Sequence, residues 1–143
     1  MKILSKKWLL IMLLWPNLGS PQNVPEKTKE AVFIASFDYY FLHEFCADLD
    51  PALSADRLEH NMQEDVQQLL PLNNQQATRF VGDFISSYNE LVSDDGEYGH
   101  AISNRIEQFN AINTSVKQES CRSMNQDRRE QFRHALKLLK SAL

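Results

Sequence analysis

The sequence predicts an all-α protein, a single-domain antiparallel bundle of about five helices with a central aromatic-rich helix and one disulfide. Apolar residues recur at helical spacing in several segments, whereas alternating Val/Ile/Thr runs bounded by turns are missing and only 4 glycines occur. The length of 143 residues fits one domain. Two cysteines suit a single covalent link in an exported chain.

The N-terminal segment has the pattern of a secretory signal peptide. Lys2, Lys6 and Lys7 precede the apolar run 8–15, and Pro16 ends that run. A signal peptide needs an apolar run of about 7–15 residues, whereas a membrane-spanning helix needs about 20. We therefore expect residues 1–20 to be removed, with cleavage between residues 20 and 24, and residues 21–143 to form one helical domain. Such a protein would be soluble and exported, either periplasmic or secreted.

Cys46 and Cys121 are the only cysteines. In an oxidising compartment two cysteines of a small domain usually pair, and the alternative is two free thiols. A bridge over so long a loop stabilises by about 4 kcal/mol in the chain-entropy model. It would join the end of the first predicted helix to the end of the fourth, with Cα atoms within about 7 Å.

The first predicted helix spans residues 25–48 and carries an aromatic ridge. Phe33, Phe37, Phe41 and Phe45 recur every four residues and therefore share one face. The opposite face is also apolar and includes Cys46. A helix that is apolar nearly all round is a buried central helix.

Four further helices follow from periodicity and end signals. Ser54 is the expected N-cap of a helix over residues 54–70, and a helix over residues 74–93 ends at the acidic turn that contains Gly96. A fourth helix begins near Gly99, and a fifth begins near Asn125 or Asp127. The fourth is expected to pack through one stripe, formed by Ile102, Ile106, Phe109, Ile112 and Val116.

Asp38 lies within the aromatic helix, where an unpaired carboxylate is costly. It must be paired, protonated or hydrated. One interpretation is an acid of raised pKa in a pocket. The other, which we favour, is an acid satisfied by a tyrosine hydroxyl or by an arginine of the fourth or fifth helix.

No motif for a metal, a cofactor or a nucleophile occurs. The four histidines share no metal-ligand spacing, and the polar turn 94–100 does not match an EF-hand loop. The chain also lacks a nucleophile elbow and a phosphate-binding glycine loop. Asn113 begins an Asn-x-Ser pattern, but it lies within the apolar stripe of the fourth helix, so we expect it to face the core.

Charge is unevenly distributed along the chain. Loss of the three leader lysines lowers the formal net charge from −4 to −7, which disfavours nucleic acid and anionic membranes as partners. Acidic residues gather in the second and third predicted helices, and Asp56, Glu59, Glu64 and Asp65 are candidate contacts for a basic partner protein. Alternatively, the basic stripe of the fifth helix neutralises these acids within the fold.

Three functional hypotheses remain open. The leading one is a non-enzymatic protein that binds another protein through its acidic face. The layout of leader, small acidic bundle and one disulfide is similar to that of periplasmic immunity proteins that neutralise secreted cell-wall hydrolases. The second is a carrier of a small hydrophobic ligand, with Phe37, Phe41 and Asp38 in a cavity of at least about 300 Å³. The third is a hydrolase that uses Asp38 or the 94–100 turn with a second carboxylate nearby.

Overall fold

The computed structural model describes residues 24–93, 96 and 98–143. The predicted signal peptide, residues 1–20, lies outside these described residues, as do Asp94, Asp95 and Glu97 of the acidic turn. The described residues form helices joined by turns, with no strand among them. The predicted all-α class is therefore confirmed.

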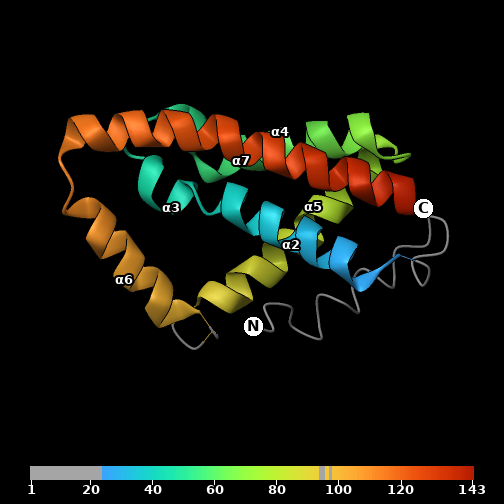
Figure 1. Cartoon of the computed structure of the whole chain (residues 1–143), viewed down its shortest axis with the longest axis horizontal. Coiled ribbons are helices and arrows are strands. Elements are labelled where there is room, and N and C mark those ends of the chain that lie inside the picture. Colours follow the sequence, from blue (N-terminus) through green and yellow to red (C-terminus); the bar gives the residue numbers. More distant parts are fainter. Residues whose placement is uncertain (1–23, 94–95, 97) are drawn as a thin grey trace.

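The chain folds into a bundle in which α2 and α7 form the largest helix pair. These two helices run antiparallel along the length of the molecule (Figure 1). In chain order the elements are α2 (Glu26–Tyr40), α3 (His43–Cys46), the short 3-10 helix η2 (Pro51–Leu53), α4 (Ala55–Leu69), α5 (Asn74–Val92), α6 (Gly99–Asn110) and α7 (Thr114–Ala142).

Helices α4 and α5 begin at side-chain caps. The Ser54 hydroxyl accepts a hydrogen bond from the Arg57 backbone N–H at 3.3 Å, as predicted. Asn73 and Gln76 form a reciprocal capping box at 2.8 and 2.9 Å. These caps satisfy backbone donors that the first turn of a helix cannot pair, so both helix starts are fixed locally.

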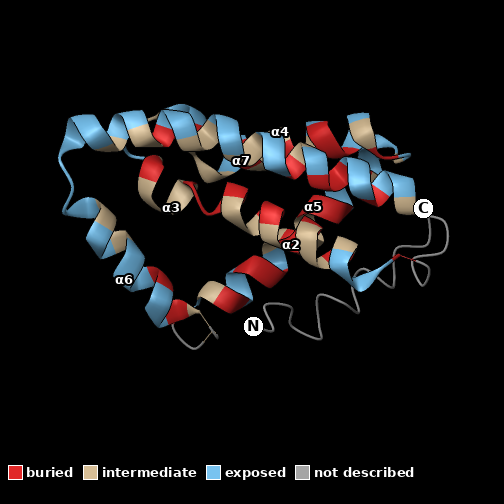
Figure 2. Ribbon diagram, viewed as in Figure 1, coloured by how far each residue is buried: buried red, intermediate tan, exposed pale blue. Residues whose placement is uncertain are grey.

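The core surrounds α2, which is the buried central helix that the sequence predicts. Val32, Phe33 and Tyr39 have no exposed surface, although they point to different sides of the helix. Buried residues of α4 and α5 lie against α2, whereas most of α6 and the outer face of α7 are exposed (Figure 2). Apolar burial on all sides of one helix makes it the element on which the others pack.

The first predicted helix is not continuous, and this part of the prediction was wrong. It breaks at Phe41 and Leu42, where the Leu42 and Glu44 N–H groups bond to carbonyls three residues back. In a continuous helix the Glu44 N–H would donate a hydrogen bond to the Tyr40 carbonyl. That carbonyl is instead hydrogen-bonded to Nδ1 of His43. A side chain thus satisfies the carbonyl that the break releases, and no proline or glycine marks the position in the sequence.

The boundary between the last two helices was also predicted wrongly. Helix α6 ends at Asn110, and α7 runs without a break from Thr114 through the position where a new helix was expected. Asn113 is the N-cap of α7, since its side chain accepts a hydrogen bond from the Ser115 N–H at 2.9 Å. Asn113 is exposed rather than core-facing, and so are Ile112 and Val116, at 43% and 53%.

The predicted disulfide is present between Cys46 and Cys121, with the Cα atoms 5.9 Å apart and a sequence separation of 75. Both cysteines are buried. Because α7 starts early, the bridge joins α3 to the second turn of α7 rather than to the end of the fourth predicted helix. It therefore closes the end of the bundle where α2 breaks.

Gly96 controls how the chain passes from α5 into α6. A Cβ atom at this position would lie 2.4 Å from the backbone carbonyl oxygens of Glu90 and Leu91, a distance that no side chain tolerates. The Tyr98 N–H also bonds to the Leu91 carbonyl at 2.9 Å. These contacts hold the start of α6 against the end of α5 and so place Tyr98 beside α2.

Candidate ligand-binding site

A pocket of about 360 Å³ lies between α2, α6 and α7. The α2 side is one helical face, because Ile34, Phe37, Asp38 and Phe41 are spaced three and four residues apart. Three of these residues, Phe37, Asp38 and Phe41, are those the sequence indicated for a cavity. Their arrangement follows from helical geometry alone.

Helix α6 and the residue that precedes it supply the facing wall. Tyr98, Ala101, Ile102 and Arg105 again share one helical face, and all line the pocket. Ile102 is buried, whereas Ala101 and Arg105 are exposed at the opening. The sequence placed Ile102 in the core, but it did not indicate that Tyr98 and Ala101 line a pocket beside Asp38.

Phe37 is the centre of the apolar wall. Its ring stacks on Phe41 with centroids 5.9 Å apart and meets Tyr98 edge-on at 6.3 Å. On its other side it contacts Tyr88 of α5 at 5.0 Å. Since Phe37 is held by rings from three segments, its orientation toward the pocket is fixed by packing.

The described part of the pocket wall also carries three charged groups. Nη1 of Arg128, on α7, donates a hydrogen bond to the Asp38 backbone carbonyl at 3.0 Å. Burial raises the pKa of the Asp38 carboxyl, and the charges of Arg128 and Arg105 partly oppose this shift. Burial also lowers the pKa of the Arg128 guanidinium, while Asp38 opposes that change. Arginines of the fourth and fifth predicted helices therefore do lie beside Asp38.

Arg105 and Arg128 affect the Asp38 carboxylate electrostatically, without a hydrogen bond to it. Among the described residues, no hydrogen bond or ion pair within 4.0 Å holds the carboxylate oxygens. Asp38 is half-buried, so water reaches it. It is also the only carboxylate among the described residues of the pocket wall, and the hydrolase hypothesis gains no second carboxylate there.

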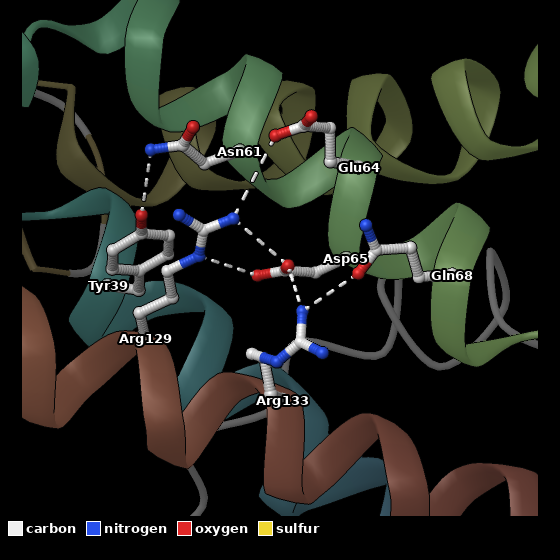
Figure 3. A network of polar contacts seen from close by, with 7 residues as sticks. All are labelled: Tyr39, Asn61, Glu64, Asp65, Gln68, Arg129 and Arg133. Carbon is white, nitrogen blue, oxygen red and sulfur yellow. Dashed lines mark hydrogen bonds and ion pairs between the residues drawn. The ribbon is translucent and has the colours of Figure 1, made fainter.

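The acidic face differs from its prediction at one residue. Asp65 was expected to be an exposed contact, but it has no exposed surface. Its carboxylate accepts two hydrogen bonds from Arg129 at 3.1 Å and another from Arg133 (Figure 3). Asp65 is therefore a structural residue that joins α4 to α7, and the intramolecular alternative holds for it.

The other three candidate acids remain at the surface. Asp56 is exposed, Glu59 is partly exposed, and the Glu64 side chain is 51% exposed and lies 3.9 Å from Arg129. Burial together with Glu59, Glu44 and Asp56 raises the pKa of Tyr40 to about 12. Asp56 and Glu59 thus lie near Glu44 around the end of α2.

A polar cluster formed by His43, Glu44 and Tyr88 was not predicted. His43 Nε2 lies 3.2 Å from Glu44 Oε1, and the Tyr88 hydroxyl donates to the same oxygen at 3.1 Å. The hydrogen bond from His43 is the largest cause that lowers the pKa of Glu44. The His43 ring packs on Tyr40 at 4.5 Å. The only sequence signal is the adjacent His43–Glu44 pair, because the tyrosines come from elements that only the fold brings together.

The turn 94–100 is described only in part. Asp94, Asp95 and Glu97 lie outside the described residues, and His100 is exposed. Within the described part of the chain, no group of three or more acidic, histidine or cysteine side chains is placed to hold a metal ion. Nor does that part contain a helix long and apolar enough to cross a bilayer.

The fold and the pocket define a disulfide-linked, all-α bundle with an aromatic pocket beside one carboxylate and two arginines. No protein-family model matches the chain, and no curated protein or solved structure shows significant similarity to it.

Proposed function

We propose that this protein binds a small, largely apolar molecule in the pocket between α2, α6 and α7. The observation that carries the proposal is the pocket itself, about 360 Å³ in volume with Phe37 and Phe41 in its wall. Ligand pockets typically hold about 300–1,000 Å³ and combine apolar walls with a few polar groups. The pocket meets both criteria. This favours the carrier hypothesis over protein binding through an acidic face that includes Asp65, because Asp65 is buried.

A titration with 1-octanol tests this proposal in the oxidised protein. Methyl signals of Ile34, Ala101 and Ile102 are expected to shift together in ¹H–¹³C spectra, because these groups line the pocket. Ala101→Phe fills the opening and should weaken binding at least tenfold. Ala111→Phe makes the same change at an exposed turn outside the pocket and should leave binding unchanged. Shifts spread over the surface, or equal effects of the two variants, would refute the proposal.

A second candidate function is protein–protein binding of the inhibitor or immunity type. It is favoured by the cluster of Asp56, Glu59 and Glu64, which stays accessible along α4 after Asp65 is removed from the set. Clustered carboxylates attract a basic surface and accelerate association at low ionic strength. A basic partner protein would approach α4 along the exposed surface that carries Asp56 and Glu64.

Capture of binding proteins from envelope extract at low and high salt tests this candidate. The triple variant Asp56→Asn, Glu59→Gln, Glu64→Gln should lose a basic protein that the unaltered chain retains at low salt. A control removes equal charge elsewhere, at the exposed positions Glu26, Glu107 and Glu119, and should retain it. Equal loss with both triple variants would indicate a net-charge effect and would exclude a defined interface on α4.

A further inference from the structure

The pocket has a size and a charge that together specify a class of ligand. A water molecule occupies about 30 Å³ in the liquid, so the ≈ 360 Å³ pocket holds about twelve groups of that size. That matches a chain of eight to ten carbons with a small head group, and it excludes a long lipid chain held along its whole length.

Among the described residues that line the pocket, the charged groups leave one unmatched positive charge. Arg105 and Arg128 stand there against one carboxylate, that of Asp38. Arg128 uses one N–H on the Asp38 backbone carbonyl, whereas a guanidinium has five donors. Arg105 has no hydrogen bond or ion pair with any described residue. Donors of both arginines are therefore free to bind an acceptor in the pocket.

The charged groups lie together on one part of the wall. Arg128 is bonded to the backbone of Asp38, and Asp38, Arg105 and Arg128 influence one another electrostatically. The rest of the wall is apolar or aromatic and includes Ile34, Phe37 and Ile102. A ligand that fits this division has an anionic head and an apolar chain.

We propose that the ligand is an amphipathic monoanion, a medium-chain carboxylate whose head group binds Arg105 and Arg128 while its chain lies along Phe37 and Phe41. This inference rests on the proposed function, since it requires that the pocket take a small molecule. A carboxylate pairs with the planar guanidinium in a bidentate geometry. One negative charge also matches the one positive charge left over beside Asp38.

The test compares three ligands of equal chain length by the same methyl titration at pH 7.5. Octanoate should bind at least tenfold more tightly than 1-octanol, and octylammonium more weakly than either. Equal affinity for octanoate and octanol, or preference for octylammonium, overturns the anion inference and leaves the pocket proposal standing. Absence of binding by all three overturns the proposed function itself.

Variants assign the head-group contact. Arg128→Gln should weaken octanoate about tenfold or more, because a charge-assisted hydrogen bond is lost in a half-buried site. Arg105→Gln should weaken it about twofold to fivefold, since Arg105 is exposed. Both should weaken octanol binding less than octanoate binding, because octanol carries no charge. Asp38→Asn should strengthen octanoate binding by removing a competing charge.

Arg122→Gln is the matched control, because Arg122 is an exposed arginine of α7 outside the pocket. It should leave octanoate affinity unchanged. An equal loss in Arg122→Gln and Arg128→Gln would mean that the anion responds only to net charge, and it would overturn the assignment. Dispersed spectra of each variant confirm that the comparison is made on folded protein.

Discussion

Asp65 of α4 and Arg129 of α7 form a two-bond ion pair in which the Asp65 side chain is fully buried and the Arg129 side chain is about one-third exposed (Figure 3). Arg133 binds the same carboxylate. One buried acid thus joins two successive turns of α7 to α4. Part of the positive charge of α7 is thus used inside the fold, as in the alternative that the basic stripe neutralises acids within the protein.

Replacement of Asp65 by asparagine should destabilise the protein by about 2–3 kcal/mol. Removal of one partner from a fully buried ion pair costs about 3–5 kcal/mol, and the cost is lower here because both arginines reach water. Urea unfolding with the disulfide intact measures the change. Glu64→Gln, at a weak and exposed pair, should stay within about 0.5 kcal/mol of the unaltered protein. A loss in Asp65→Asn no larger than in Glu64→Gln would contradict the structural role of Asp65.

Removal of the disulfide should lower the free energy of unfolding by about 4 kcal/mol. The bridge closes a loop between residues 75 apart, and the unfolded chain gains the corresponding entropy when the loop opens. The double variant Cys46→Ala, Cys121→Ala, compared with the oxidised protein in urea, measures this effect. The single variants serve as controls. Each loses the same bridge, so its free energy of unfolding should be close to that of the double variant. A double variant as stable as the oxidised protein would show that the link adds nothing to this fold.

Tyr40 should ionise far above the usual range for tyrosine. Its pKa is raised to about 12 by burial and by nearby carboxylates, against about 10 in an unfolded chain. A raised pKa favours the neutral phenol, so its stabilisation is complete below about pH 10 and is lost as the pH rises through about 12. Absorbance at 295 nm should show that Tyr40→Phe removes a phenol that ionises near pH 12. Loss of a phenol that ionises near pH 10 would contradict this placement of Tyr40.

The start of α7 should depend on the side chain of Asn113. Asn113→Ala removes the acceptor that caps the Ser115 N–H and should cost about 1 kcal/mol. Asn113→Ser keeps a capping oxygen and should restore most of the stability. Amide hydrogen exchange over residues 114–118 provides a local measurement, with faster exchange in the alanine variant only. If both variants exchange alike, the cap does not determine this helix start.

Much of the fold was predictable because local rules agreed with tertiary packing. Ser54 caps α4 as its sequence context indicates, and the apolar faces of α2 are both buried. The pairing of Cys46 with Cys121 followed from composition and the expected compartment. The cavity candidates Phe37, Phe41 and Asp38 line one pocket because residues three and four apart on a helix must share a face.

The helix boundaries were predicted wrongly where a polar side chain outside the apolar pattern determines where a helix begins or ends. His43 satisfies the Tyr40 carbonyl at the break after α2, and Asn113 starts α7 eleven or more residues before the expected position. The polar segment 122–127 was interpreted as a boundary, although it lies on a helix that is largely exposed there. Apolar periodicity cannot distinguish a gap between helices from a helix that extends past the core.

The sequence by itself determined the helical class, the central position of α2, and the residues of α2 that face the pocket, because each depends on spacing along one helix. Only the tertiary structure decided which partners these residues meet. Arg105 and Arg128 come to Asp38 from α6 and α7, and Arg129 and Arg133 bury Asp65 from another face of α7. Contacts between helices depend on how each rotates and slides against its neighbours, and the pattern within a single helix leaves that packing open.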